Sequence, residues 1–187
     1  MIKDRTALAA GVLLVSPPMS ADPHFSRSVV LVCEHSGAGS FGLILNQPLT
    51  VTMDQLFDEL MAFSDEVGWG GPVQPDTLHF IHRGDELIPE AIPVREGIMW
   101  GGDFDMVRAR IVDGGLDPDD IRFFLGYAGW SPGQLQAEVD AGGWIVTQAT
   151  EDYVFDTAED DLWQQVLRGM GGAFAILANA PEHPSLN

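Results

Sequence analysis

The sequence predicts an α+β fold built on a mixed, largely antiparallel sheet. Strand-like segments outnumber helical ones, and they do not alternate strictly with helices as they do in a doubly wound parallel sheet. The 21 glycines and 12 prolines among 187 residues indicate many turns, which favours short strands. The length suits one domain over residues 1–187, large enough to bury a core without a disulfide or a structural metal.

Strands are expected wherever an apolar or β-branched segment is bounded by Gly, Pro, Asn or Asp. These segments are Gly11–Ser16, Ser28–Glu34, Phe41–Asn46, Thr77–His82, Gly97–Trp100, Arg122–Tyr127 and Trp144–Thr147. The first one belongs to an apolar run that follows Lys3 and Arg5 and mimics a signal peptide. The run is too short to span a bilayer, and Met19 is too large for a cleavage site. We therefore interpret it as a buried strand of a protein of the bacterial cytoplasm.

Helix starts are indicated by capping patterns ahead of apolar residues. They are Thr52-x-x-Gln55, Asp103 before Phe104–Val112 with Gly114-Gly115 behind it, Ser131-Pro132-Gly133-Gln134 with proline at the first helical position, and Thr157-x-x-Asp160 with Gly169 behind it. Each pattern satisfies backbone N–H groups that the first helical turn leaves without partners.

The charge balance argues against nucleic acid as a partner. The chain has 28 acidic and 9 basic residues, which gives a formal net charge of −19 and a pI near 4.2. Proteins that bind nucleic acid draw much of their affinity from Lys and Arg that neutralise phosphates, and the basic residues here are scattered. We therefore expect no direct nucleic-acid binding and no association with a membrane.

Several motifs that suggest cofactors have simpler structural explanations. Residues 37–42 match the glycine pattern of dinucleotide sites, but a strand follows them instead of a helix, which favours a hairpin. His79 and His82 would lie on opposite faces of a strand. The acidic turn Asp113–Asp120 lacks the alternating oxygen ligands of a calcium loop. The single cysteine, Cys33, excludes an intrachain disulfide and a multi-cysteine zinc site. We expect neither a metal nor a cofactor.

Cys33-Glu34-His35 is the triplet with the most reactive residue types. Residues two apart on a strand share a face, so Cys33 and His35 should point the same way, roughly 6.5 Å apart. An imidazolium at that distance lowers a thiol pKa, which would suit a cysteine-dependent enzyme or a redox sensor with a reactive Cys33. The alternative is a small buried core residue after Val29–Val32, with His35 satisfied at the strand end. We favour the buried thiol and assign no catalytic residue.

Residues 126–134 form a glycine-rich connection between an expected strand and an expected helix. Tyr127 and Trp130 could anchor a partner there, and amides at the helix start could bind an anion. Alternatively, the two rings are core residues, the glycines permit close packing, and Ser131 and Gln134 satisfy the amides. We expect a ligand- or partner-binding surface that joins this connection to the hairpin end. Its residues are Glu34, His35, Asn46, Gly126, Tyr127, Gly129, Trp130, Ser131, Gly133 and Gln134.

Blocks of specific sequence run in order along nearly the whole chain. They are Asp22-Pro23-x-Phe25-x-Arg27-Ser28-Val29-Val30, Cys33-Glu34-His35, Gly42-Leu43-Ile44-Leu45-Asn46-Gln47-Pro48, Gly70-Gly71-Pro72-Val73, residues 124–135 and the tail Ala178–Asn187. Together they resemble the YqgE/AlgH family. The resemblance implies a bifurcated mixed sheet folded into a pseudo-barrel with flanking helices, and it places the first strand in the mature domain.

The same resemblance implies little about activity. The family has no established reaction, some members carry the label transcriptional regulator from genetic effects, and no catalytic residue can be carried over. We therefore expect a non-catalytic regulatory or binding protein that acts through a protein partner or a small ligand. The alternatives are a cysteine-dependent enzyme or redox sensor that uses Cys33 and His35, and a DNA-binding regulator, which the net charge disfavours.

Overall fold

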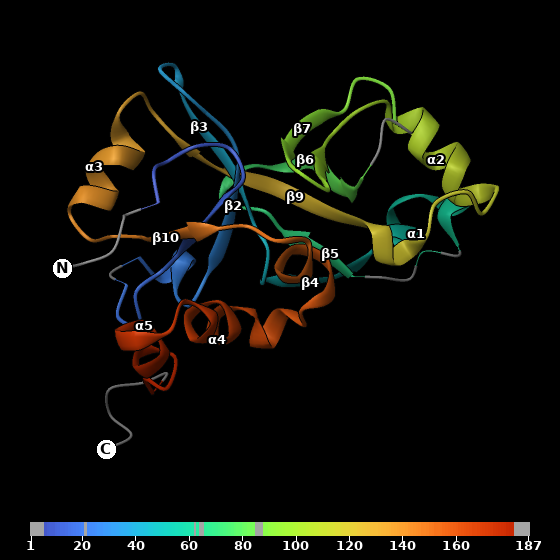
Figure 1. Ribbon diagram of the computed structural model, residues 1–187. Helices are drawn as coiled ribbons and strands as arrows, with labels where there is room; N and C mark the ends of the chain where they lie inside the picture. Colours follow the sequence, from blue (N-terminus) through green and yellow to red (C-terminus); the bar gives the residue numbers. More distant parts are fainter. Residues whose placement is uncertain (1–5, 21, 62, 64–65, 85–87, 182–187) are drawn as a thin grey trace.

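Strands from along the chain combine into one curled, mostly antiparallel sheet in the computed structural model (Figure 1), which describes residues 6–20, 22–61, 63, 66–84 and 88–181. Lys3, Arg5 and the last six residues of the tail block lie outside these ranges. Within them the strands are β1 Val12–Val15, β2 Val29–Ser36, β3 Gly39–Ile44, β4 Pro48–Thr52, β5 Glu66–Trp69, β6 Val73–Arg83, β7 Ile92–Arg95, β8 Ile98–Trp100, β9 Ile121–Trp130 and β10 Ile145–Gln148.

The strand order explains both the curl and the mixed character of the sheet. The main path runs β10-β1-β2-β3-β9-β6-β8-β7, and every pair along it is antiparallel. β5 branches from it, pairing antiparallel with β4 and parallel with β9. The two ends of the path approach each other. A Cβ placed on Gly11, directly before β1, would lie only 2.8 Å from the carbonyl oxygen of Val94 in β7. The predicted α+β class is therefore confirmed, with the sheet curled into a half-barrel.

All the expected strands are present, and three further strands were not predicted. β4 begins at Pro48, β5 contains Gly68, and β7 contains Pro93, so each carries a residue that weakens the strand pattern. Proline is tolerated where a strand has a free edge, and β7 lies at the end of the main path. Their proline and glycine residues therefore explain why the sequence pattern did not predict these strands.

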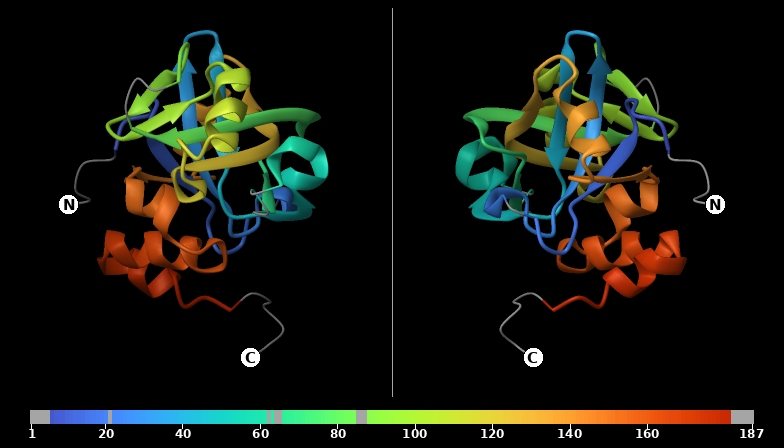
Figure 2. Two further views of the ribbon diagram at one scale, coloured as in Figure 1. Left: turned by 90° about the vertical axis from the view of Figure 1, so that its right-hand side faces the viewer. Right: turned by 90° about the vertical axis from the view of Figure 1, so that its left-hand side faces the viewer.

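The helices lie at the ends and on one side of the sheet. They are α1 Met53–Leu56, α2 Phe104–Val112, α3 Gln134–Asp140, α4 Glu159–Met170 and α5 Gly172–Leu177, with short turns η1 Pro23–Phe25, η2 Asp58–Leu60, η3 Pro118–Asp120 and η4 Asp152–Asp156. α3 flanks one end of the sheet, and α1 and α2 flank the other (Figure 1). α4 and α5 lie together at the side away from the β2–β3 hairpin (Figure 2). No helix in the described ranges is long and apolar enough to cross a bilayer.

Two helix starts match their patterns and two do not. Asp103 caps α2, accepting from the amides of Asp105 and Met106 at 2.9 and 3.1 Å, and the Gln55 side chain accepts from the Thr52 amide at 3.2 Å. α3 begins at Gln134 instead of Pro132, because Gly133 has a left-handed φ of +76° that a helix interior excludes.

The expected start and end of the last predicted helix are also wrong. α4 begins at Glu159, and the Thr157 hydroxyl donates to the Asp152 carbonyl instead of capping the helix. Its C-terminal end is Met170, so Gly169 lies inside the helix and Gly171 follows it.

The sheet and helices enclose three apolar clusters. The first fills the concave side of the sheet, where buried residues of α4, among them Leu162 and Val166, pack on Leu31 and Phe124. The second lies between α1, α2 and the strands β6 and β9, and the third lies between α3 and the other face of β1, β2 and β3. The sheet is therefore covered by apolar clusters on both faces.

Candidate functional site

A β-bulge in β2 separates the side chains of Cys33 and His35. The register with β3 shifts after Val32, so Cys33 stands outside the ladder and His35 pairs with Ser40. Ser40 also pairs with Trp130, which belongs to the cluster beneath α3, whereas Cys33 belongs to the cluster on the concave side. Directly paired residues share a face, so His35 and Cys33 point to opposite faces. The expected alignment of thiol and imidazole is wrong.

The surroundings of Cys33 suppress its reactivity. Only 2% of the residue is exposed, and its Sγ lies 3.8 Å from the Leu31 carbonyl oxygen. Burial raises the pKa of the Cys33 thiol far above its ordinary value, so the nucleophilic thiolate is disfavoured. His35 is engaged elsewhere, with Nδ1 2.7 Å from the Ser40 hydroxyl. These contacts support a core role for Cys33.

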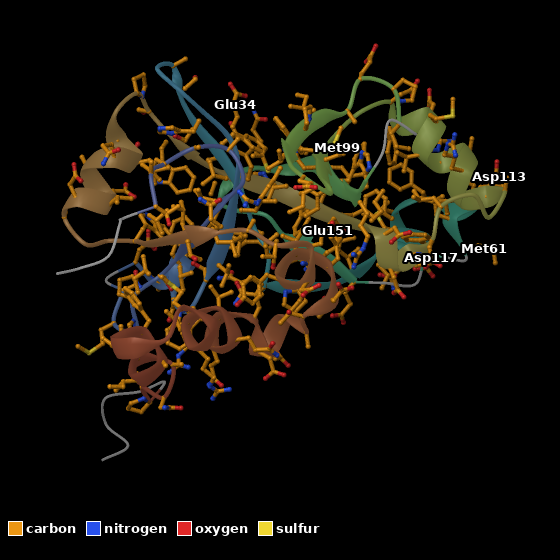
Figure 3. All side chains as sticks on the ribbon, viewed as in Figure 1. Glu34, Met61, Met99, Asp113, Asp117 and Glu151 are labelled. Atoms are coloured by element: carbon orange, nitrogen blue, oxygen red, sulfur yellow. The ribbon has the colours of Figure 1, made fainter. Side chains whose placement is uncertain are left out.

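Glu34 and Tyr127, two of the expected binding residues, lie beside one aromatic stack. The ring of Phe41 is sandwiched between those of Trp100 and Tyr127, with centroid distances of 4.5 and 4.6 Å, and His79 meets it edge-on at 5.1 Å. Glu34 pairs with Phe41 and therefore shares its face. Figure 3 shows Glu34 on the hairpin, at the side of the molecule away from α4 and α5. The structure thus brings these two together, and their binding role stays a prediction.

The expected binding loop is, for most of its length, the end of β9. Gly126, Tyr127, Gly129 and Trp130 all belong to this strand. The strand continues through the glycines because it pairs with β3 on one side and β6 on the other. A Cβ on Gly126, whose φ is +71°, would lie 2.4 Å from the carbonyl oxygen of Gly71. This glycine therefore permits close packing of two backbones, and the interpretation of the segment as a loop is wrong.

Trp130 is a core residue, which is the alternative stated for it above. Only 7% of it is exposed, and its indole N–H donates to Glu138 Oε2 at 2.9 Å. The indole of Trp144 donates to the same oxygen at 2.9 Å. Next to it, the Ser131 amide donates to the Gln134 side chain at 3.0 Å, so this amide has a partner. Ser131, Gly133 and Gln134 are exposed where α3 begins.

Asn46 lies at the far end of β3 from the hairpin turn. Its Nδ2 donates to the Arg27 carbonyl at 2.9 Å, and its Oδ1 accepts from the Val29 amide at 2.8 Å. The side chain thereby ties the chain entering β2 to the chain leaving β3. Grouping Asn46 with Glu34 and His35 is wrong, because those residues pair with Phe41 and Ser40 at the other end of the strand.

Two other motifs, the glycine pattern and the histidine pair, have the predicted structural explanations. The glycine pattern forms the β2–β3 hairpin, with Ser36 paired to Gly39. His79 packs on Phe41 at the concave side, whereas His82 stacks on Phe80 in the second cluster, so the two histidines face opposite ways. Among the described residues, no three His, Cys, Asp or Glu side chains are grouped so as to hold a metal ion.

A cavity of about 420 Å³ lies between β5, β9 and the segments η3, η4 and α4. Aromatic rings and carboxylates share its wall, together with one guanidinium. Its described lining residues are Phe63, Glu66, Gly68, Pro118, Asp119, Ile121, Arg122, Phe123, Phe155 and Glu159. Its volume lies in the range typical of small-molecule sites, which combine apolar walls with a few convergent polar groups. None of the residues expected to bind a ligand is in this set, so the sequence-based prediction missed this candidate site.

Arg122, the second residue of β9, projects into the wall of the cavity. Its Nη1 donates to the Val154 carbonyl at 2.8 Å, and its Nη2 donates to the Leu45 carbonyl at 2.6 Å. Nη2 also donates to Glu159 Oε1 at 2.5 Å, and the guanidinium lies 5.3 Å from the ring centroid of Phe124. The side chain is only 16% exposed. β9, η4, α4 and the residue directly after β3 therefore meet at this guanidinium.

Glu159 is the first residue of α4 and lines two cavities at once. The second cavity, of about 190 Å³, is also lined by Ser26, Arg27, Asn46, Asp160, Trp163 and Gln164. Burial raises the pKa of Glu159, and Arg122 opposes part of that rise; burial likewise lowers the pKa of Arg122 against the effect of Glu159. In both groups the cost of desolvation exceeds the gain from pairing. A pair of this kind is therefore weak evidence for stability.

A signal for this site is present in the sequence. Arg122 interrupts the apolar segment Ile121–Leu125, and a buried charge inside such a segment must be paired or cost free energy. Its partner Glu159 lies 37 residues further along the chain and carries no local mark. Arg122 could therefore have been identified from the sequence as a candidate site residue, whereas its pairing with Glu159 and the cavity could not.

Comparison with known proteins places the chain among uncharacterised relatives. A family model described as AlgH-like matches residues 13–175. A UPF0301 protein of Chlorobium limicola is 39% identical over 187 residues, with all of both chains covered. Another, from Cytophaga hutchinsonii, is 39% identical over 181 residues, covering 96% of this chain and all of the relative.

Solved structures support the fold. The solution structure of the AlgH protein from Pseudomonas aeruginosa has a TM-score of 0.74 at 24% identity, covering 98% of this chain and all of that one. The crystal structure of a protein from Corynebacterium diphtheriae has a TM-score of 0.75 at 23% identity, covering 96% of this chain and all of that one. At these identities the likeness concerns the fold alone.

Proposed function

The chain belongs to the AlgH-like family, and we propose that it is a non-catalytic binding protein whose ligand occupies the 420 Å³ cavity beside Arg122 and Glu159. The observation that carries this proposal is the buried Arg122–Glu159 pair on the wall of a cavity of ligand size. Shifted ionisable groups in a cleft favour a functional site over a purely structural one.

The lining favours a ligand with a cationic group on an apolar body. Glu159 is paired with Arg122, so the cavity keeps the charges of Glu66 and Asp119 in excess. The net charge of −19 adds an attractive field for cations. The ring of Phe155 and the edges of the buried rings of Phe63 and Phe123 supply apolar contact for the rest of the molecule. We infer a small aromatic or aliphatic amine, or the basic side chain of a partner that enters the cavity.

The chemistry of the wall supports binding more than catalysis. The described lining residues include no Cys, His, Ser or Thr, and the most buried carboxylate is paired with a guanidinium. The one thiol lies buried in the concave core, where burial raises its pKa. A rival role as a cysteine-dependent enzyme or redox sensor thus lacks an accessible nucleophile beside an imidazole.

Three probes of the same shape test the charge preference directly. Phenethylamine, 2-phenylethanol and 3-phenylpropionate carry a cationic, a neutral and an anionic group on the same phenyl-ethyl body. Calorimetric titration at low salt should show binding in that order of affinity, weakening for phenethylamine as salt screens the attraction. Equal affinity for all three, or a preference for the anion, would contradict the proposed ligand class.

Matched variants locate the effect. Glu66→Gln combined with Asp119→Asn removes the two excess charges from the cavity rim and should weaken phenethylamine binding roughly fivefold. Glu96→Gln combined with Asp76→Asn removes two exposed charges that line none of the cavities described here, and should leave the affinity near wild type. A loss that is the same in both variants would mean that the overall charge attracts the amine without a site.

A further inference from the structure

The outer face of α2 forms one side of a groove that no role described so far uses. Together with η2, it encloses an open hollow of about 540 Å³ lined by Glu59, Asp105, Arg108, Ala109, Val112 and Asp113. We infer that this α2 groove is a docking surface for a basic, amphipathic helical segment of a partner protein. The groove shares no described lining residue with the proposed ligand cavity, so the two proposals stand or fall separately.

The groove is built on rigid elements. Val107 and Ile111 anchor the inner face of α2 in the second core cluster. Residues 105, 108, 109 and 112 recur at helical spacing, so they form one continuous stripe on the opposite side. An ion pair between Arg108 and Glu59 ties this stripe to η2, and the rings of Phe57 and Phe104 pack 5.3 Å apart beneath it. The hollow therefore exists before any partner arrives.

Apolar side chains are unusually exposed around the groove. Val112 in its wall is 64% exposed, and Met106, which helical spacing places beside Ala109 and Asp113, is 38% exposed. Met61, directly after η2, is 80% exposed. Met61 and Asp113 lie at the same end of the molecule (Figure 3). Flexible methionines adapt to the side chains of a bound helix, as they do on other helix-binding surfaces.

The charge around the groove determines which helix fits. Arg108 is the single cation among the described lining residues, and it is already paired with Glu59 and Asp105. The described lining therefore carries two negative charges in excess, and the protein as a whole is strongly acidic. A partner helix that covers Val112 must therefore carry Lys or Arg beside its apolar stripe, since acidic residues would be repelled.

A synthetic helix tests this directly. The probe is an 18-residue fluorescein-labelled peptide of Leu and Lys, with leucines at positions i, i+3, i+4 and i+7, measured by fluorescence anisotropy. Val112→Lys places a like charge in the groove and should weaken binding by about tenfold or more. Ile176→Lys makes the same change of charge at an apolar side chain of α5 that is 75% exposed, and should stay within about twofold of wild type.

Each other outcome overturns the inference. Equal weakening by Val112→Lys and Ile176→Lys would show that binding follows overall charge. Equal affinity for a peptide of the same composition with leucines at every second position would show that no helix is recognised. If sedimentation velocity shows that the wild type is a dimer and Val112→Lys a monomer, the occupant is a second copy of the chain. Backbone amide shifts of labelled wild type must also centre on residues 105–113, and shifts elsewhere would contradict the assignment.

Discussion

The carboxylate of Glu159 lies 2.5 Å from the guanidinium of Arg122, at the junction of β9 with the first turn of α4. Burial lowers the pKa of Arg122 and raises the pKa of Glu159, so it favours the neutral form of each group. Burying the charged pair therefore costs free energy. The carbonyls of Leu45, directly after β3, and of Val154 in η4 hold the guanidinium. Glu159 is thus the only side-chain carboxylate bonded to Arg122 among the described residues.

Replacing one member of the Arg122–Glu159 pair should destabilise the protein by more than half of what replacing both members does. Arg122→Met and Glu159→Met each leave a partly desolvated partner, and each should lower the free energy of unfolding by about 3 kcal/mol. The double variant Arg122→Met/Glu159→Met should cost at least about 1 kcal/mol less than the sum. Urea unfolding measures all three, with exposed Arg168→Met as the control. Strict additivity would mean that the two groups do not interact.

His79 should make the protein less stable in mild acid. Burial lowers the pKa of His79 below the ordinary value of 6.5, so the unfolded chain takes up the proton more readily than the native one. The resulting contribution to stability is present above pH 6.5 and is lost as pH falls toward the lower native pKa. His79→Phe keeps an aromatic ring in the stack and removes the titration. Its free energy of unfolding should fall less than that of wild type between pH 7 and 5. The opposite ranking would contradict the buried, neutral imidazole.

Cys33 should react slowly in the native protein, whatever happens to His35. The thiol is buried, and the bulge directs the imidazole to the other face of the sheet. Iodoacetamide labelling followed by mass spectrometry should show protection in wild type and in His35→Ala, and rapid labelling of both in urea. Fast native labelling that disappears in His35→Ala would restore the redox or enzymatic hypothesis.

Trp130 should act as a stability determinant. Its ring is buried beside Leu135 and Trp144, and its indole N–H is bonded to Glu138, so Trp130→Ala should cost about 3–5 kcal/mol. Ser131→Ala, at the exposed neighbouring position, should cost less than about 1 kcal/mol. Denaturant midpoints of the two variants give the comparison. A near-neutral Trp130→Ala would return the ring to the role of an exposed anchor.

Local sequence signals predicted the elements whose causes are local. Asp103 and Gly114 bound α2 as expected, because a cap and a helix stop act within a few residues. The bulge after Val32 could not be foreseen, since it depends on how β3 registers against β2 and β9 together. That one extra residue reverses the face of His35, and with it the most reactive-looking motif of the sequence.

The candidate site depends on contacts between segments far apart in the chain. Arg122 meets the carbonyl of Leu45 and the carboxylate of Glu159 only after β3, β9 and α4 have packed together. No spacing rule connects these positions, so the cavity was absent from the predicted binding residues. The branch strand β5 contributes Glu66 and Gly68 to the cavity, and this strand was itself not predicted.

The position of bound phenethylamine tests the proposed site most directly. Backbone amide spectra of labelled wild type should shift first at Gly68, Phe123 and Phe155 and leave Glu34 and Val112 unchanged. The shifts should shrink in Glu66→Gln/Asp119→Asn and persist in Glu96→Gln/Asp76→Asn. Saturable shifts confined to the aromatic stack around Phe41 or to the α2 groove, or no saturable shift at millimolar amine, would contradict a ligand site beside Arg122 and Glu159.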